Sequence, residues 1–262
     1  MESVCVVTGG ARGIGRGIAE QLVARGHGVV VTDVQGAMAA DTAAEIGALA
    51  GLEQDIRDAA SHAAVAEEAS RHGRLRAWFN NAGVGDDGRL SENTEEQVRR
   101  LVEVNVLGTM WGMRAALATF GPDGGDIVNT ASLAGLGPVP GYSVYAATKA
   151  AVVSISMSVD AETPKNVRVH ALCPDVVQTA MLVEGHTAGS LGTQLAHSGG
   201  RILPVEEVAR EAVDLLGGRR VVRSVPRHRG LLVRATAVAP SISQKGMPLF
   251  VALGRRTLAK QA

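Results

Sequence analysis

The stretch Thr8-Gly9-Gly10-Ala11-Arg12-Gly13-Ile14-Gly15 decides the fold, because it joins a β-branched run to a helical pattern. The run before it, Val4–Thr8, has the composition of a buried strand, and Ile14–Arg25 after it has apolar residues at helical spacing. A strand, a glycine-rich turn and a helix N-terminus together form an anion site, in which backbone N–H groups and the helix dipole face a phosphate. The stretch alone fits either a structural turn or a dinucleotide-binding βαβ unit, and an acidic residue after the second strand, described below, favours the dinucleotide site.

The same alternation of strand and helix continues along the chain. Further buried strands are predicted at Gly28–Asp33, Ala77–Asn80, Asp126–Ser132 and Val167–Cys173, with a weaker one at Ala48–Glu53. Helical patterns lie between them at Gly36–Ile46, Ala59–His72, Glu95–Phe120 and Val144–Glu162. Regular helices between parallel-type strands predict an α/β fold, a doubly wound parallel sheet (Rossmann fold) in a three-layer αβα sandwich.

Local signals mark the ends of two helices. Thr94 and Gln97 have the spacing of a capping box where the longest helical pattern begins. Pro204 opens a further helix, and Gly217–Gly218 ends it. Because the chain has no linker or repeat, we expect one domain, in which residues 1–216 form the dinucleotide-binding catalytic part. Residues 217–262 would add a last strand and a basic C-terminal extension, helical or irregular.

Composition excludes several classes of protein. With 46% hydrophobic residues in 262 positions, the chain has enough apolar material for a sizeable core, and disorder is excluded. Cys5 and Cys173 cannot form a disulfide scaffold and lie in strand patterns, so we expect core positions and a cytoplasmic protein. The longest uncharged stretch, Ile127–Thr148, contains prolines, glycines and polar residues and does not predict a membrane span. No signal peptide is expected, because the first strand pattern starts by Val4.

The net charge of zero conceals an asymmetry. After Asp214 there is no acidic residue, and the last 48 positions carry 10 Lys and Arg, so residues 1–214 carry −10. Apolar residues lie among these cations at Leu249, Phe250, Val251, Leu253 and Leu258. One hypothesis is an amphipathic helix at a membrane surface in a dinucleotide-sensing protein. Packing within the chain or between subunits is the favoured interpretation, and no aromatic platform or motif indicates nucleic-acid binding.

An acidic residue after the second strand bears on the choice of dinucleotide. Asp33 lies 24 residues after Gly9, where a carboxylate accepts hydrogen bonds from the adenosine ribose and repels a 2′-phosphate. Arg12 favours the opposite choice, because an arginine there can hold that phosphate. We give Asp33 more weight. The repulsion between a carboxylate and a 2′-phosphate costs more free energy than the attraction to a flexible arginine recovers. The sequence therefore predicts NAD as the cofactor, with NADP as the alternative.

A second constellation has the chemistry of proton transfer. Tyr145 and Lys149 are four residues apart in a helical pattern and lie on one face. A free tyrosine has a pKa of about 10. A neighbouring ammonium, and then an oxidised nicotinamide, is expected to lower the pKa of Tyr145 so that it can take a proton from an alcohol. Ser132, at the end of the preceding strand, is expected to orient the substrate oxygen.

These motifs resemble those of the short-chain dehydrogenase/reductase family. They are the Gly-x3-Gly-x-Gly spacing of Gly9, Gly13 and Gly15, the run Asn80-Asn81-Ala82-Gly83, and Tyr145-x3-Lys149, over residues 3–216. The resemblance implies that Asp55 and Ile56 flank the adenine, and that Asn81, Ala82 and Gly83 line the cofactor cleft beside Ile14. It also implies that Pro174, Val177 and Thr179 lie by the nicotinamide. Asn105 would complete the catalytic set with Ser132, Tyr145 and Lys149 by holding a water that links Lys149 to solvent.

The expected function is interconversion of an apolar secondary alcohol and its ketone by hydride transfer with NAD. The alternatives are an NADP-dependent carbonyl reductase and the membrane-peripheral sensor. A mostly apolar pocket is expected from Val84, Leu133, Ala134, Leu136, Val139, Pro140, Tyr142 and a lid loop, Met181–Arg201. On that loop His186 and His197 could contact substrate, although solvated positions are favoured. The histidines show no metal-ligand spacing, and no metal site is expected.

Two departures from the family pattern stand out. The usual Pro-Gly is Pro174-Asp175 here, and the carboxylate could be solvated or could contact substrate. The common hydrophobic-Asp-Gly-Gly ending is replaced by a strand-like Val221–Val225, the run Leu231–Ala239 and a helix from Pro248. Because that ending often builds a subunit interface, the choice between homodimer and homotetramer stays open. The middle helix and the Tyr145-bearing helix, both long and rich in small residues, are expected to form a dimer.

Overall fold

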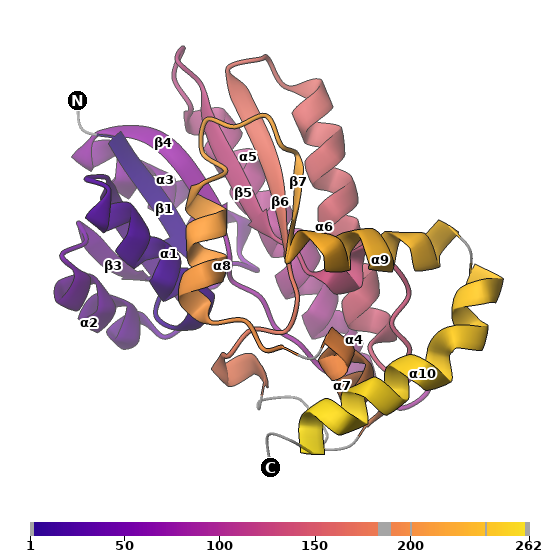
Figure 1. Cartoon of the computed structure of the whole chain (residues 1–262). Coiled ribbons are helices and arrows are strands. Elements are labelled where there is room, and N and C mark those ends of the chain that lie inside the picture. Colours follow the sequence, from indigo (N-terminus) through magenta and orange to yellow (C-terminus); the bar gives the residue numbers. More distant parts are fainter. Residues whose placement is uncertain (1–2, 183–189, 200, 239, 260–262) are drawn as a thin grey trace.

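The computed structural model describes residues 3–182, 190–199, 201–238 and 240–259. In this part of the chain, parallel strands form a seven-stranded sheet with the order β3-β2-β1-β4-β5-β6-β7 (Figure 1). The strands are β1 (Ser3–Thr8), β2 (Gly28–Asp33), β3 (Ala50–Glu53), β4 (Arg74–Asn80), β5 (Gly125–Thr130), β6 (Val167–Pro174) and β7 (Val222–Val225). The order reverses between β1 and β4, and ligands of such sheets bind outside the carboxyl ends of the strands at this point.

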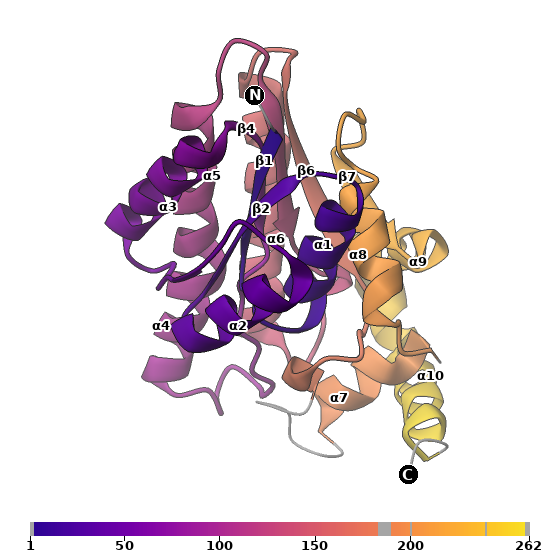
Figure 2. The same ribbon diagram turned by 90° about the vertical axis from the view of Figure 1, so that its left-hand side faces the viewer.

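Helices cover both faces of the sheet (Figure 2). They are α1 (Gly13–Ala24), α2 (Gly36–Ile46), α3 (Ala59–His72), α4 (Glu95–Val102), α5 (Thr109–Thr119), α6 (Ser143–Glu162), α7 (Leu191–Ala196), α8 (Val205–Val213), α9 (Arg227–Val238) and α10 (Pro240–Ala259). Side chains of β1 alternate between two cores: Cys5 and Val7 pack with α1, α2 and α8, whereas Val4 and Val6 pack with α3, α5 and α6. The predicted doubly wound, three-layer fold is confirmed.

Several elements have the predicted bounds, because their sequence signals are local. The strand Gly28–Asp33 and the helices Gly36–Ile46 and Ala59–His72 agree residue for residue. The capping box is also present: Thr94 Oγ1 accepts a hydrogen bond from Gln97 N at 3.2 Å, and Gln97 Oε1 accepts one from Thr94 N at 2.8 Å. Both cysteines are free and buried.

The prediction of a single helix over Glu95–Phe120 is wrong for the middle of this range. A π-helical turn, η1 (Glu103–Gly108), separates α4 from α5. At Gly108 a β-carbon would lie 2.6 Å from Ile56 Cδ1, so the backbone approaches that side chain closely. Asn105 lies on this turn and is buried. Single π turns are frequent at functional sites, and this one sets the direction of the Asn105 side chain.

The strand predicted to end at Ser132 ends at Thr130 instead. Ser132 is the cap of a 3₁₀ turn, η2 (Leu133–Gly135), and its Oγ accepts a hydrogen bond from Ala134 N at 3.1 Å. Serine side chains often compete for backbone N–H groups in this way and end regular structure.

The C-terminal part is more helical than the sequence indicates. β7 pairs with β6, so the seventh strand comes from residues after 216, although the proposed division at 216 stays a prediction. The run Leu231–Ala239 falls largely within α9, and the helix expected from Pro248 begins at Pro240, with Pro248 inside it. Proline suits the first helical position, because the backbone N–H that it lacks would have no partner within the helix there. No helix among the described residues is long and apolar enough to cross a bilayer.

Candidate active site

A cavity of about 670 Å³ lies at the carboxyl ends of the strands. It is lined by most of the residues that the sequence assigns to the site: Gly9, Arg12, Gly13, Ile14, Asp33, Asp55, Ile56, Asn81, Ala82, Gly83, Ser132, Tyr145, Lys149, Pro174, Val177 and Thr179. Gly15 and Asn105 do not line it. One continuous space therefore joins the acidic end of β2 to the Tyr145–Lys149 pair.

The glycine-rich turn after β1 has the backbone that its sequence requires. Gly9 and Gly13 have φ values of 60° and 56°, in the left-handed region that favours glycine. A β-carbon at Gly9 would lie 2.6 Å from Ala82 Cα. At Gly15 a β-carbon would lie 2.1 Å from Gly9 O, so this glycine lets α1 pack against the turn and supports the site from outside the cavity.

The turn is joined to the segment after β4 by Thr8 and Asn81. Thr8 Oγ1 accepts hydrogen bonds from Asn81 N at 3.1 Å and Ala82 N at 3.2 Å. The Asn81 side chain in return donates to Thr8 O at 3.2 Å and Gly9 O at 3.1 Å. These contacts fix the two walls of the cleft relative to each other.

The carboxylate of Asp33 is held by the backbone. Ala11 N donates to its Oδ2 at 3.3 Å, and Gln35 N donates to its Oδ1 at 3.1 Å. Arg12, the N-cap of α1, is exposed and lines the same part of the cavity. Both residues that compete in the choice between NAD and NADP are therefore present at one end of the cleft.

Asp55 carries a partner that the sequence reading did not consider. Its carboxylate lies 2.6 Å from Arg57 Nη2 in an ion pair, and Arg57 also lines the cavity. Hydrogen bonds from Arg57 hold the pKa of the Asp55 carboxyl below its usual range. Asp55 therefore presents an ionised carboxylate to the cavity beside Ile56, and the adenine contact expected there stays a prediction.

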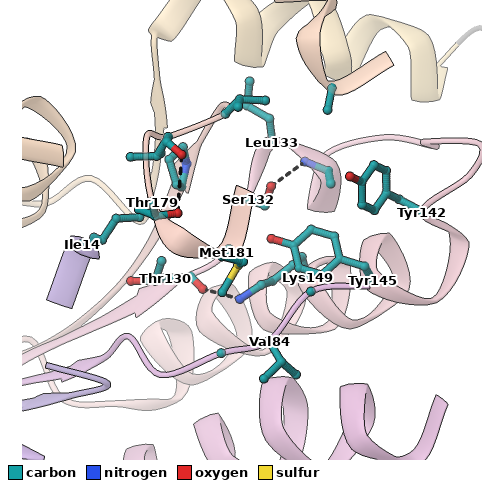
Figure 3. A pocket seen from close by; sticks show the side chains of 18 of the residues that line it. Ile14, Val84, Thr130, Ser132, Leu133, Tyr142, Tyr145, Lys149, Thr179 and Met181 are labelled. Carbon is teal, nitrogen blue, oxygen red and sulfur yellow. Dashed lines mark hydrogen bonds between the residues drawn. The ribbon is translucent and has the colours of Figure 1, made fainter. Parts of the chain in front are cut away.

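Ser132, Tyr145 and Lys149 converge at the other end of the cavity (Figure 3). Ser132 is hydrogen-bonded to the Tyr145 side chain. Lys149 Nζ donates to Thr130 O at 2.8 Å and lies 5.8 Å from the centre of the Tyr145 ring. The spacing of four residues thus places both side chains on the face of α6 that turns toward η2.

Burial acts on the pKa of Tyr145 in the direction opposite to the expected lowering, and the lowering expected from an oxidised nicotinamide stays a prediction. Burial raises the pKa of the Tyr145 phenol above its ordinary value, and the hydrogen bond with Ser132 opposes that rise. Burial also lowers the pKa of Lys149 to about 8. Desolvation disfavours the charged form of each group. Tyr145 is therefore a neutral phenol beside an ammonium group at neutral pH.

Asn105 is buried, and both ends of its side-chain amide are hydrogen-bonded. Its Oδ1 accepts from Val84 N at 2.9 Å, and its Nδ2 donates to Val84 O at 2.9 Å and to Thr148 Oγ1 at 3.1 Å. Thr148 directly precedes Lys149, so Asn105 ties the segment after β4 to α6. The water relay implied by the resemblance stays a prediction.

The substrate end matches the expected pocket in part. Val84, Leu133, Ala134, Val139, Tyr142 and Met181 line the cavity, whereas Leu136 and Pro140 do not. Leu195 and Ala196, from the predicted loop Met181–Arg201, also line the cavity. The sequence reading missed a second set of lining residues from α9 and α10: Leu232, Val233, Thr236, Met247 and Phe250. Their only sequence signal was apolar residues at helical spacing in the basic segment.

The segment expected to be a lid loop contains α7 and a short turn, η4 (His197–Gly199). His197 is buried and does not line the cavity, and its Nδ1 is hydrogen-bonded to Thr193 O at 2.8 Å. The expectation of a solvated or substrate-contacting His197 is therefore wrong. His186 lies outside the described residues.

Asp175 is neither solvated nor free to bind substrate by itself. Its Oδ2 lies 2.9 Å from Arg229 Nε of α9, and both side chains are largely buried. The two residues line the cavity next to Pro174. The two departures from the family pattern, the carboxylate after Pro174 and the basic C-terminal segment, thus meet in one ion pair. Among the described residues no cluster of three His, Cys, Asp or Glu could hold a metal ion.

Comparison with known proteins gives several similar oxidoreductases. The L-2,3-butanediol dehydrogenase of Corynebacterium glutamicum is 38% identical over 193 residues, which are 69% of this chain and 74% of that protein. The sorbitol dehydrogenase of Cereibacter sphaeroides is 40% identical over 177 residues, which are 66% of this chain and 69% of that protein.

A solved structure and a family model agree with these relatives. The crystal structure of a short chain dehydrogenase/reductase from Burkholderia phymatum in complex with NAD is 27% identical, with a TM-score of 0.80, and the match covers 92% of this chain and 95% of that chain. The model of the short chain dehydrogenase family matches residues 3–188. The chain therefore belongs to the short-chain dehydrogenase/reductase family and is an oxidoreductase that acts on CH–OH or carbonyl groups.

Proposed function

We propose that the protein is an NAD-dependent oxidoreductase that interconverts an apolar secondary alcohol and its ketone, with Tyr145 as the acid and base. The observation that carries the proposal is a single cavity with Asp33 at one end and Ser132, Tyr145 and Lys149 at the other. The relatives named for 2,3-butanediol and sorbitol support oxidation of a secondary alcohol.

The residues of the chain divide the chemistry among them. Ser132 Oγ binds and orients the substrate oxygen, and the Tyr145 phenol exchanges the proton of the alcohol O–H. Lys149, held by its hydrogen bond to Thr130 O, stabilises negative charge on the phenolate oxygen. Bound NAD would supply the hydride acceptor for the carbinol carbon, so that the alcohol would lose one hydride and one proton in all. In the reverse direction, the neutral Tyr145 donates its proton to the ketone oxygen.

The chain has the parts that would hold NAD. The turn with Gly9 and Gly13 in left-handed conformations would face the pyrophosphate, and Asp33 would accept from the ribose hydroxyls. Asp55, Ile56, Asn81, Ala82 and Gly83 would line the adenosine side and the cleft, and Pro174, Val177 and Thr179 the nicotinamide side. The solved structure with NAD supports this choice, whereas Arg12 is the basis of the NADP alternative. Asn105 would hold the water of a proton relay to Lys149.

The test is an assay of NAD reduction across secondary alcohols with the Tyr145→Phe variant as comparison. We expect turnover with wild type and a loss of at least about a thousandfold in kcat for Tyr145→Phe, because one general acid–base group is worth about 10²–10⁴-fold and phenylalanine leaves no substitute. NADH binding, followed by fluorescence, should stay within about twofold. A variant that kept most of its dehydrogenase activity would exclude Tyr145 as the proton-transfer group.

Assembly and location are part of the proposal. The helices α4 and α6 and the turn η1 expose Val102, Leu107 and Met157, which supports a homo-oligomer formed through this face. Cys5 and Cys173, both free and buried, are compatible with the reducing cytoplasm that we propose as its location.

A further inference from the structure

The substrate end of the cavity has a wall that lies beyond the family match. The match ends at residue 188, whereas Leu232, Val233 and Thr236 on α9 and Met247 and Phe250 on α10 line the cavity. Four of these five side chains are apolar, and the charge of Arg229 of α9, which also lines the cavity, is paired with Asp175. The hydroxyl of the fifth, Thr236, donates to Val233 O at 2.7 Å. Neither helix contains an acidic residue. The wall therefore offers van der Waals contact and little that would replace the hydration of a hydroxyl-rich substrate.

We propose that this wall, the inner faces of α9 and α10, is an apolar subsite that takes a hydrocarbon group of several carbons on the substrate. The Asp175–Arg229 ion pair holds the wall in place. The proposal rests on the proposed function, because it takes the reacting carbon to lie between Ser132 and Tyr145. It narrows the substrate from a secondary alcohol in general to one that carries an extended alkyl or aryl group.

The first support is the way α9 is fixed to the body. Arg229, in its first turn, pairs with Asp175 at 2.9 Å, and the two side chains are 13% and 10% exposed. Its Nη2 also lies 3.4 Å from Ser198 Oγ of η4. The ion pair bridges 54 residues of sequence. Removing one partner of a buried pair leaves an uncompensated charge, so Asp175 and Arg229 are positioning residues for the α9 half of the wall.

The second support is the way α10 packs on α7. A β-carbon at Gly254 would lie 1.6 Å from Gln194 O, so the two backbones are in direct contact. Arg255 Nε donates to Gln194 Oε1 at 2.9 Å. Leu195 and Ala196, the next residues of α7, line the same cavity. Figure 1 shows α10 running along α7 below α9. The subsite is therefore part of the packed molecule.

The experiment measures NAD reduction by a series of 2-alkanols, from 2-butanol to 2-octanol. With wild type we expect kcat/KM to rise by up to about fourfold per added methylene, which is the transfer free energy of a buried CH₂ group. Phe250→Ala should lower kcat/KM for 2-octanol about tenfold or more and change that for 2-butanol less than about twofold. The matched control is Leu249→Ala, because Leu249 is the adjacent residue on α10, is 64% exposed and does not line the cavity.

A binding measurement separates the subsite from the chemistry. Calorimetric titration of 2-octanone in the presence of NAD should show about tenfold weaker binding by Phe250→Ala and no change for Leu249→Ala. Should Phe250→Ala fail to fold, Met247→Ala replaces it, with the same expectation. Selective binding without turnover of any alcohol would overturn the proposed function and leave the subsite standing. Turnover with equal kcat/KM along the series, unaffected by both wall variants, would overturn the subsite alone.

The ion pair has its own test. Arg229→Met should raise the KM for 2-octanol at least about fivefold, with kcat for 2-butanol and the Kd for NADH each within about twofold, because only the wall moves. The conservative Arg229→Lys should restore most of the affinity. If Arg229→Met changed the kinetic constants for 2-octanol and 2-butanol equally, or lowered only the unfolding temperature, the ion pair would have no part in positioning the subsite.

Discussion

At the scale of single residues, the carboxylate of Asp33 is oriented before any ligand arrives. Both of its oxygens accept backbone hydrogen bonds, from Ala11 N and Gln35 N. Ribose hydroxyls would therefore meet a rigid acceptor, whose ordering costs nothing on binding. A 2′-phosphate in the same place would face a negative charge that cannot turn away without breaking those two bonds. The fixed orientation of Asp33 strengthens the case for NAD beyond its charge alone.

We expect Asp33→Ala to change the cofactor preference. The NADH affinity should fall about tenfold and the NADPH affinity should rise, so that their ratio shifts by about a hundredfold, or near 3 kcal/mol. Titration of NADH and NADPH by fluorescence measures both constants. The matched control is Glu53→Ala, because Glu53 pairs in register with Asp33 on β3 but does not line the cavity. A wild type that prefers NADPH would mean that Arg12 decides the preference.

The Tyr145–Lys149 pair shows how burial acts on the protonation of the two groups. Burial raises the pKa of Tyr145 and lowers that of Lys149 to about 8, so near neutral pH the phenol is protonated and the ammonium is still charged. This state suits proton donation to a ketone. In the oxidation direction Tyr145 must first lose its proton, which a nearby positive charge such as an oxidised nicotinamide makes easier. Local spacing predicted the pair, but the effect of burial on its pKa values depends on tertiary packing.

At the scale of elements, strands and helices were predictable where the signal was local. The β-branched run Gly28–Asp33 and the helix Ala59–His72 need only their own sequence. The π turn Glu103–Gly108 was not predicted, since its residues fit one helical pattern over Glu95–Phe120. The close approach of Gly108 to Ile56 is a contact with another part of the chain, which the local pattern does not show.

The C-terminal wall escaped the sequence reading for a similar reason. Apolar residues on α9 and α10 are compatible with a core, a membrane surface or a pocket, and only the fold decides among these. The Asp175–Arg229 pair joins residues that are 54 positions apart, and no spacing rule connects them. Asp175 was recognisable as a departure from the family pattern, but its partner was not.

A buried carboxylate links neighbouring strands near their amino ends, at the end of the sheet opposite to the active site. Asp126, at the start of β5, pairs with Arg168 of β6 at 2.7 Å and with Arg76 of β4, and accepts from Gly217 N at 3.1 Å. Burial by itself would raise the pKa of Asp126, but hydrogen bonds from His170 and Arg168 and the charge of Arg76 outweigh it and hold the pKa below its usual range. This cluster supports three neighbouring strands without contact with the cavity.

We expect Asp126→Asn to lower the unfolding free energy at pH 7 by about 3 kcal/mol, because it removes a fully buried carboxylate that is the counter-charge of two half-buried arginines. Since the folded pKa lies below the unfolded value of about 3.9, the stabilisation is present above that pH and is lost as the pH falls. The difference between wild type and variant should therefore shrink between pH 5 and pH 3, as measured by urea unfolding. Asp123→Asn, at an exposed pair with Arg74, should cost less than about 1 kcal/mol.

At the scale of the whole molecule, the basic C-terminal segment is attached to the acidic body by ion pairs. Arg223 pairs with Glu211 at 2.6 Å, and Arg229 pairs with Asp175 at 2.9 Å. The opposite charges of the two regions, +10 and −10, are thus partly neutralised by contacts inside the molecule. This arrangement agrees with packing within the chain, the interpretation that the sequence favoured for this segment.

The same packing bears on the membrane hypothesis. Of the five apolar residues that motivated it, Phe250 lines the cavity and Val251 and Leu258 are half-buried, which leaves Leu249 and Leu253 turned outward. A helix that uses part of its apolar face inside the protein has less to insert into a bilayer. The hypothesis stays a prediction, and sedimentation with anionic vesicles at low salt tests it.

A further set of exposed apolar side chains lies on α4, η1 and α6. Val102 on α4, Leu107 on η1 and Met157 on α6 are 39%, 37% and 53% exposed, and α4 and α6 are in contact. Exposed apolar side chains on neighbouring helices favour an isologous interface, in which the same face of a second copy covers them. We therefore expect a homodimer in solution, as measured by size-exclusion chromatography with light scattering.

Met157→Asp should convert this dimer to a monomer, because each interface would bury two carboxylates related by the two-fold axis. The matched control is Leu49→Asp, since Leu49 is 37% exposed but precedes the edge strand β3 at the far side of the sheet. If Met157→Asp stayed dimeric while truncation of α10 gave monomers, the interface would lie on the C-terminal helices. The apolar subsite would then adjoin a second subunit, and its affinity for 2-octanone would depend on protein concentration.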